Sequence, residues 1–144
     1  MKLKKQDYLF LYVSLGLIVL DQLTKCLIRF FMQKGQSIAL IPHVLHLTYI
    51  QNTGSAFGLF QNTTSLLIWF SVFVLGLIFY LYDKIPFVPR ILLTGGIVGN
   101  LIDRIFLKFV VDFIDFRVWP AFNIADSCLT IGVIILIIYL LKKK

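Results

Sequence analysis

The stretch NLIDRIFLKFVVDFIDF, Asn100 to Phe116, places three aspartates and an arginine in otherwise strongly hydrophobic sequence. Ionised groups at the centre of a membrane-spanning helix cost at least about 2.5 kcal/mol each, so they normally face the protein interior and pair. The second half, FVVDFIDF, is typical of an extended run rather than of a helix. The stretch therefore predicts a polar site where a membrane helix ends.

The composition of the whole chain indicates a small integral membrane protein. Hydrophobic residues make up 59% of its 144 residues and charged residues 15%, whereas soluble domains carry about 25% charged residues. The net charge of +7 does not indicate nucleic-acid binding, because lysines cluster at the tips of apolar segments. That placement is typical of a topology signal, so we expect no nucleic-acid partner.

Four segments are apolar enough to cross a membrane, which takes about 20 residues. They cover about residues 8–28, 65–82, 91–109 and 123–141. The first resembles a secretory signal, but DQLTK follows it instead of a cleavage site, so we expect a retained helix. The more polar segment of about residues 30–64 contains HVLHLTYI, which favours strands. We expect an all-α membrane protein with four transmembrane helices and a small β-containing extracytoplasmic element between helices 1 and 2, all in one domain over 1–144.

The distribution of positive charge predicts the orientation in the membrane. Eight cationic residues fall on the side of both termini and four on the opposite side of a four-helix arrangement. Both termini are therefore expected in the cytoplasm, and the strand-bearing loop outside. The eight are Lys2, Lys4, Lys5, Lys84, Arg90 and Lys142 to Lys144; the four are Arg29, Lys34, Lys108 and Arg117.

Aspartates from three helices are expected at one depth. At about 1.5 Å of rise per residue, Asp21 lies roughly 20 Å along the first helix and Asp103 roughly 18 Å along the third, and both helices run outward. Asp126 lies near the start of the fourth helix, which runs inward, and Asp112 and Asp115 follow the third helix. The polar residues thus converge in the outer half of the bilayer, as a site would.

Partners for these charges are available within the helices. Asp21 and Lys25 are spaced i, i+4, and Asn100 and Arg104 share one helix face in the same way. We expect the first pair to be structural.

The third helix carries two different faces. Gly95 and Gly99 form a GxxxG pattern, which lets another backbone approach closely. Gly96, Asn100 and Arg104 continue an adjacent face. We expect this helix to be packed on one side and polar on the other.

Several catalytic chemistries find no support in the sequence. No serine or cysteine has a plausible histidine base, and no HExxH or similar metal spacing occurs. His43 and His46 fall in the predicted strand at odd spacing, which puts them on opposite faces. Cys26 and Cys128 are isolated in apolar runs and are expected to act as small hydrophobes. We expect no metal and no cofactor.

Pairs of carboxylates remain as candidates, because two adjacent carboxyls cannot both ionise easily and one can then act as base toward water. The residues alone leave the pair open. Asp126 could simply cap the fourth helix together with Asn123. Asp112 and Asp115 would lie on opposite faces of a strand, so that one points inward. Asp103 could be a structural charge neutralised by the adjacent arginine.

Two other classes of function also use polar residues inside membranes. A proton- or cation-coupled transporter would need acids along a path through both leaflets, whereas the inner half of each predicted helix lacks charge. A scaffold subunit would explain the GxxxG pattern and the ion pairs.

Five motifs together resemble the lipoprotein signal peptidases, also called signal peptidase II. Their order and spacing match over essentially the whole chain. Two features depart from the family pattern: Ser55 stands where the family commonly has alanine, and the segment between Asp112 and Asn123 is short. The motifs are DQLTK at 21–25, NTGSAF at 52–57, GGIVGNLIDR at 95–104, VVDF at 110–113 and FNIADS at 122–127.

The resemblance implies an aspartyl endopeptidase whose catalytic pair is Asp112 and Asp126. We therefore expect Asn100 and Asn123 to hydrogen-bond near this pair or near the peptide backbone, and Arg104 to orient substrate or to anchor the outer loop. The residues implied to bind substrate or support the site are Asp21, Lys25, Asn52, Gly54, Asn100, Arg104 and Asn123.

The implied partners follow from the same resemblance. The substrate would be a lipid-modified prolipoprotein, cut just before a cysteine that carries diacylglycerol. The enzyme would be a monomer in the bacterial cytoplasmic (inner) membrane, in contact with membrane lipid, with its site toward the extracytoplasmic side. Globomycin-type cyclic peptides would inhibit it.

Overall fold

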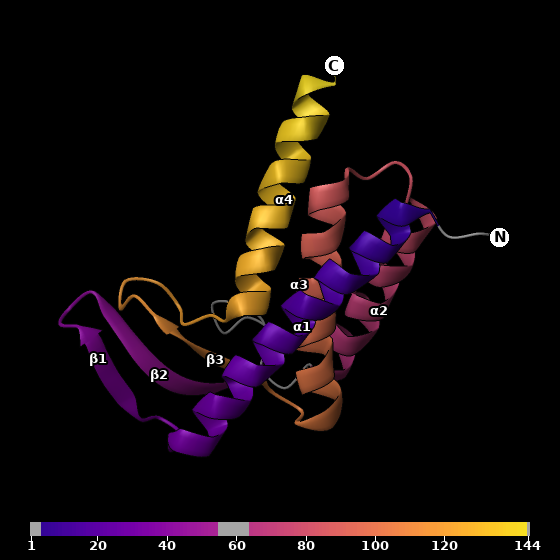
Figure 1. Ribbon diagram of the computed structural model, residues 1–144. Coiled ribbons are helices and arrows are strands. Elements are labelled where there is room, and N and C mark those ends of the chain that lie inside the picture. The colour runs from indigo at the N-terminus through magenta and orange to yellow at the C-terminus, as the bar shows by residue number, and fades with distance from the viewer. Residues whose placement is uncertain (1–3, 55–63, 144) are drawn as a thin grey trace.

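The computed structural model describes residues 4–54 and 64–143, which form four helices and three strands. Figure 1 shows the helices as a bundle, with the sheet projecting sideways from one end and both termini toward the other. In chain order the elements are α1 (Lys5–Phe31), β1 (Ser37–Ile41), β2 (Leu45–Asn52), α2 (Thr64–Tyr80), α3 (Phe87–Phe106), β3 (Val110–Asp115) and α4 (Ile124–Lys142).

All four predicted helices are present, with ends that differ by a few residues. The largest difference is at the start of the third helix, which begins four residues earlier than predicted, and it also ends at Phe106 rather than at residue 109. Lys108 has φ 68°, a left-handed conformation that cannot continue a helix. Of the described helices, α1 and α4 are long and apolar enough to cross a membrane, and α2 is a shorter apolar helix.

The predicted β-containing element is present, but the sheet is larger than expected. β1 and β2 form an antiparallel hairpin, and β3 pairs with β2, so the order is β1-β2-β3. This third strand comes from beyond α3, far from the loop in which strands were predicted. Its register places Ile50 opposite Asp112 and Asn52 opposite Val110. The sheet therefore carries an aspartate from one strand and an asparagine from its neighbour to the same end.

The helix α3 lies between the others and contacts α1, α2 and α4 (Figure 1). Gly99 faces α1, where a Cβ would lie 2.7 Å from Oδ2 of Asp21. Gly96 faces α4, where a Cβ would lie 2.6 Å from the backbone oxygen of Ala125. Gly95, the other glycine of the GxxxG pattern, also faces α1, because its Cβ would lie 3.2 Å from Cβ of Leu17. The predicted close approach is therefore correct, but the adjacent face is also closely packed and not simply polar.

A hydrophobic cluster fixes the sheet to the end of α1. Ile28 and Met32 pack against Tyr49 of β2 and against Val111 and Phe113 of β3. Val111 is fully buried and Phe113 is nearly so. Because successive side chains of a strand point to opposite faces, this packing against the end of α1 directs the residue between them, at position 112, to the other face of β3, toward Asn123 at the start of α4.

Candidate active site

Asp112 lies on β3 with both carboxylate oxygens held by asparagine side chains. Nδ2 of Asn123 donates to Oδ1 over 2.7 Å, and Nδ2 of Asn52 donates to Oδ2 over 2.9 Å. Asn52 comes from the neighbouring strand β2, so the sheet itself places this donor. Only 2% of Asp112 is exposed.

Burial raises the pKa of the Asp112 carboxyl to about 7. This value already includes a smaller rise caused by the negative charge of Asp126 and the opposing effects of the hydrogen bonds from Asn52 and Asn123 and of the positive charge of Lys25. An acid in such surroundings can keep a proton at neutral pH, as a general acid must.

Asp126 lies in the first turn of α4 and forms a capping box with Asn123. The Asn123 side chain accepts a hydrogen bond from the backbone N–H of Asp126 over 2.9 Å, and Oδ2 of Asp126 accepts from the backbone N–H of Asn123 over 3.2 Å. Oδ1 accepts from Nδ2 of Asn100 over 2.7 Å. The predicted cap is therefore confirmed, and the same carboxylate also contacts Asn100 on α3.

Asn123 connects the two carboxylates. Its side-chain oxygen caps α4 beside Asp126, while its Nδ2 donates to Asp112 and also lies 3.2 Å from Oδ1 of Asn100. It is completely buried. One side chain thus sets the position of the strand that carries Asp112 relative to the helix that carries Asp126.

A buried lysine lies behind this pair. Nζ of Lys25 is 2.8 Å from Oδ2 of Asp21, 3.2 Å from Oδ2 of Asp103 and 2.9 Å from Oδ1 of Asn100. The three N–H donors of the ammonium thus meet three acceptors. The expected Asp21–Lys25 pair is present, but Asp103 pairs with Lys25 on another helix and not with the adjacent Arg104.

The two buried aspartates of this cluster hold the backbone just before each carboxylate of the site. The N–H of Ala125, one residue before Asp126, donates to Oδ1 of Asp21 over 2.9 Å. The N–H of Val111, one residue before Asp112, donates to Oδ2 of Asp103 over 3.0 Å. The charged cluster therefore positions both chain segments at once.

Gln22 completes this cluster and was not predicted. Its Nε2 lies within hydrogen-bond distance of Oδ2 of Asp21, the backbone oxygen of Gly99 and Oδ1 of Asp103. Its place inside the DQLTK motif is the signal in the sequence that could have indicated it.

A cavity of about 670 Å³ opens in front of the two carboxylates. The predicted residues divide between its wall and the layer behind it: Asn52, Gly54, Arg104, Asp112 and Asp126 line it, whereas Asp21, Lys25, Asn100 and Asn123 do not. The unpredicted lining is mainly apolar and comes from Val110, the segment 119–122 and one face of α4, including Leu129 and Ile131.

The segment that follows Asn52, the last residue of β2, is described only as far as Gly54. The backbone N–H of Gly54 donates to Oδ1 of Asn52 over 3.0 Å, which orients the amide so that its Nδ2 faces Asp112. Ser55 and the rest of the predicted NTGSAF motif, residues 55–57, lie outside the described residues.

Asp115, the second acid of β3, does not belong to this site. Asp115 is 7% exposed and is therefore buried like Asp112, but of the two only Asp112 lines the cavity, which agrees with the expectation that one of them points inward. Asp115 accepts from Thr48 and Arg117 and is not among the residues that line the cavity. Within residues 4–54 and 64–143, no three His, Cys, Asp or Glu side chains are grouped to hold a metal ion.

The family model and similar curated proteins indicate the same family for this chain. The family described as Signal peptidase (SPase) II matches residues 13–142. The chain is 42% identical over 137 residues to the lipoprotein signal peptidase of Halothermothrix orenii, covering 92% of this chain and 94% of the relative. It is 41% identical over 133 residues to that of Moorella thermoacetica, covering 88% and 89%.

Solved structures of bacterial membrane enzymes share the fold. One aligns with a TM-score of 0.86 and 37% identity, covering 92% of this chain and 87% of that one. Another aligns with a TM-score of 0.83 and 36% identity, covering 94% of both chains.

Proposed function

This chain belongs to the signal peptidase II family, whose members are proteases that process lipoproteins in membranes, and we propose that Asp112 and Asp126 are its catalytic pair. The observation that carries the proposal is the position of these two carboxyls on the wall of one cavity. Each of their four oxygens accepts a hydrogen bond from a fixed donor. Such pre-organisation is what an acid–base pair needs.

The pair would act through one shared proton. The raised pKa of Asp112, about 7, favours a state near neutral pH in which one carboxyl is protonated and the other is ionised. The ionised carboxylate takes a proton from a water molecule, whose oxygen attacks the carbonyl carbon of the scissile amide. The protonated carboxyl gives its proton to the carbonyl oxygen, and a tetrahedral diol forms.

Collapse of the diol completes the hydrolysis. The carboxyl that took the water proton passes it to the amide nitrogen, and the carbon–nitrogen bond breaks. One hydroxyl of the diol returns its proton to the other carboxylate as the new carboxylic acid forms. The pair then again holds one proton, so the cycle consumes one water and needs no further group.

The proposed substrate is a prolipoprotein whose cysteine carries diacylglycerol, cut on the N-terminal side of that cysteine. The cavity suits such a substrate because a polar wall with Arg104 and the two aspartates meets an apolar wall with Leu129 and Ile131. Peptide groups would lie against the first wall and acyl chains against the second. Globomycin-type cyclic peptides would compete for the same cavity.

The proposed topology places all four helices across the bacterial inner membrane, with both termini in the cytoplasm. The charge distribution of the sequence supports this orientation, since eight cationic residues accompany the termini and four the other side. In Figure 1 the termini lie toward one end of the bundle and the sheet at the other. The carboxylate pair would then lie where the outer leaflet meets water, in a monomeric enzyme.

The decisive experiment is cleavage of a diacylglyceryl-modified lipoprotein precursor by the purified protein in liposomes. Asp112→Asn and Asp126→Asn should each remove activity while the protein still inserts and folds. Asp115→Asn is the matched control, because Asp115 is a buried acid on the same strand that does not line the cavity. Near-normal turnover by either Asp112→Asn or Asp126→Asn would refute the pair.

A further inference from the structure

A second hollow lies on the sheet, apart from the cavity that holds the carboxylate pair. Its volume is about 430 Å³, and its lining consists of Ala39, Pro42, His43, His46 and Arg117. The proposed peptidase activity uses none of these residues. His43 was predicted in a strand but lies in the turn between β1 and β2, which brings it to the same hollow as His46.

A chain of side-chain contacts holds this hollow together across three strands. Oγ of Ser37 on β1 lies 3.2 Å from Nδ1 of His46 and 2.8 Å from Oγ1 of Thr48, both on β2. Thr48 donates to Oδ2 of Asp115 on β3 over 2.8 Å, and Nη1 of Arg117 donates to the same oxygen over 3.1 Å. His46 and Arg117 are thus held in a fixed relation.

The hollow offers donors rather than acceptors. Asp115 is the acid beside it, and its carboxylate already accepts from Thr48 and from the backbone and side chain of Arg117. Arg117 has five N–H donors, and its side chain is still 48% exposed. Two imidazoles add further N–H groups. Donors of this kind, with a guanidinium among them, suit the oxygens of a phosphate group.

The backbone at this hollow is held in an uncommon conformation. His43 has φ 63° and Arg117 has φ 65°, so two of the three described non-glycine residues in the left-handed region line it. Such conformations are unfavourable for residues other than glycine and are found where the surroundings enforce them, often at binding sites. The same two residues supply cationic or donor side chains.

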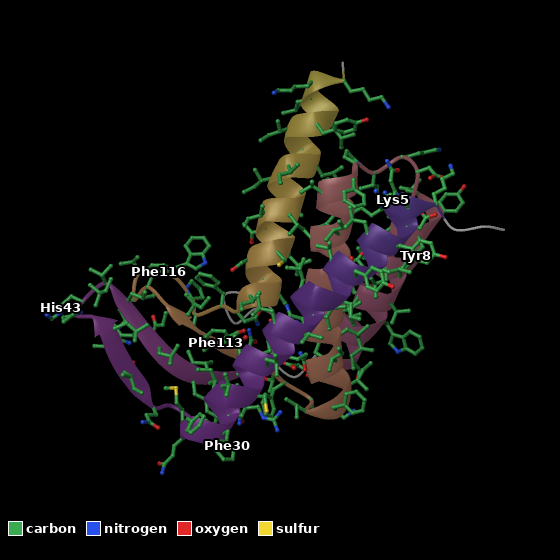
Figure 2. All side chains as sticks on the ribbon, in the orientation of Figure 1. Lys5, Tyr8, Phe30, His43, Phe113 and Phe116 are labelled. Atoms are coloured by element: carbon green, nitrogen blue, oxygen red, sulfur yellow. The ribbon has the colours of Figure 1, made fainter. Side chains whose placement is uncertain are left out.

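The position of the hollow relative to the helices indicates where its ligand comes from. Figure 1 shows the β1–β2 hairpin projecting sideways beyond the helices, and Figure 2 shows His43 at its far tip. Ile41 and Val44 beside it are each 52% exposed. In a membrane this hairpin would lie over the lipid around the bundle, and apolar side chains next to cationic ones are typical of a segment at the lipid interface.

We propose that this hollow binds the phosphate group of an anionic phospholipid in the outer leaflet. The lipid phosphate contacts Arg117, His43 and His46, and its acyl chains lie beside the exposed apolar residues of the hairpin. The site anchors the sheet to the membrane next to the carboxylate pair. This inference rests on the proposed topology and not on the catalytic roles of the two aspartates.

Binding of defined probes to the purified full-length protein in detergent tests the proposal. Native mass spectrometry would compare dioctanoyl phosphatidylglycerol, dioctanoylglycerol and inorganic phosphate. We expect the phospholipid to bind at least about tenfold more tightly than the diacylglycerol, and Arg117→Gln and His43→Gln each to weaken it about fivefold. Lys34→Gln, which removes an exposed cation from the turn before β1, is the matched control and should leave binding unchanged.

Three outcomes would overturn the proposal. Equal binding of the diacylglycerol would show that only apolar contact matters. Equal losses of phospholipid affinity in Lys34→Gln and Arg117→Gln would indicate general charge attraction rather than a specific site. Displacement of the phospholipid by equimolar inorganic phosphate would assign the site to free phosphate. Circular dichroism establishes that each variant is folded, and Asp126→Asn should bind the phospholipid normally even though it is expected to be inactive.

Discussion

The ammonium of Lys25 lies 2.9 Å from the side-chain oxygen of Asn100, and Nδ2 of the same asparagine donates to Asp126. A buried charge is therefore only one residue away from a carboxylate of the cavity. The same ammonium pairs with Asp21 and Asp103, and all three charged side chains are at most 2% exposed. Orientation of Asn100 and folding of the bundle depend on the same group.

Replacing this lysine should destabilise the protein strongly. Lys25→Met keeps the apolar stem but leaves Asp21 and Asp103 buried without their cation, and breaking a buried pair in this way costs about 3–5 kcal/mol. Unfolding in detergent, followed by circular dichroism, measures the loss. Lys34→Met, at an exposed position, should change stability by less than about 0.5 kcal/mol. The double variant Lys25→Met with Asp103→Asn should recover part of the loss, since one buried charge is removed; no recovery would contradict the electrostatic explanation.

Asn123 allows helix capping to be separated from positioning of the carboxylates. Serine at this position can still cap α4, but its short side chain cannot reach Asp112, which the asparagine contacts at 2.7 Å. We expect the free energy of unfolding of Asn123→Ser to lie within about 1 kcal/mol of that of the native protein. The variant should nevertheless cleave a lipoprotein precursor about 100-fold more slowly. Asn123→Ala should lose the cap as well. Full activity in the serine variant would show that the bond to Asp112 is unimportant.

The contact between α3 and α4 should be sensitive to a single methyl group. Gly96→Ala would place a Cβ 2.6 Å from the backbone oxygen of Ala125, and a backbone atom cannot move aside as a flexible side chain can. We expect a loss of about 1–3 kcal/mol and reduced cleavage, because Ala125 precedes Asp126. Gly16→Ala is the control: no atom beyond its chain neighbours and the backbone of its own helix lies within 4 Å of its added Cβ, so helix propensity should leave stability unchanged or raise it by up to about 1 kcal/mol.

Local relationships in this protein could be predicted from the sequence. The Asp21–Lys25 pair follows from i, i+4 spacing on one helix, and the cap of α4 follows from Asn123 three residues before Asp126. Both depend on neighbours along the chain, whose geometry is set once a helix forms. The resemblance of the motifs then supplied the candidate pair that spacing alone had left open.

Relationships between elements were harder to predict, because they depend on how helices and strands are rotated and shifted against each other. Asp103 was expected to be neutralised by the adjacent Arg104, but its partner is Lys25 on another helix. The pairing of β3 with β2, which brings Asn52 to Asp112, joins segments about 60 residues apart. A register shift between Leu47 and Ile50, where three residue steps of β2 face two of β3, also departs from simple alternation, so face assignments by odd or even spacing are unreliable across this part of β2.

The pH dependence of cleavage should depend on the surroundings of Asp112. Its pKa of about 7 means that the shared proton is lost as the pH rises through neutrality, so kcat/KM should fall on the alkaline side from about pH 7. The hydrogen bond from Asn52 stabilises the ionised carboxylate and lowers this pKa. Asn52→Leu removes that donor, so the alkaline limb should move to higher pH while the maximum rate decreases. Gln51→Leu is the control, because Gln51 bonds to Tyr49 and not to the carboxylates, and its profile should match that of the native protein. A limb in Asn52→Leu that stays in place or moves to lower pH would show that Asp112 does not carry the proton that limits activity.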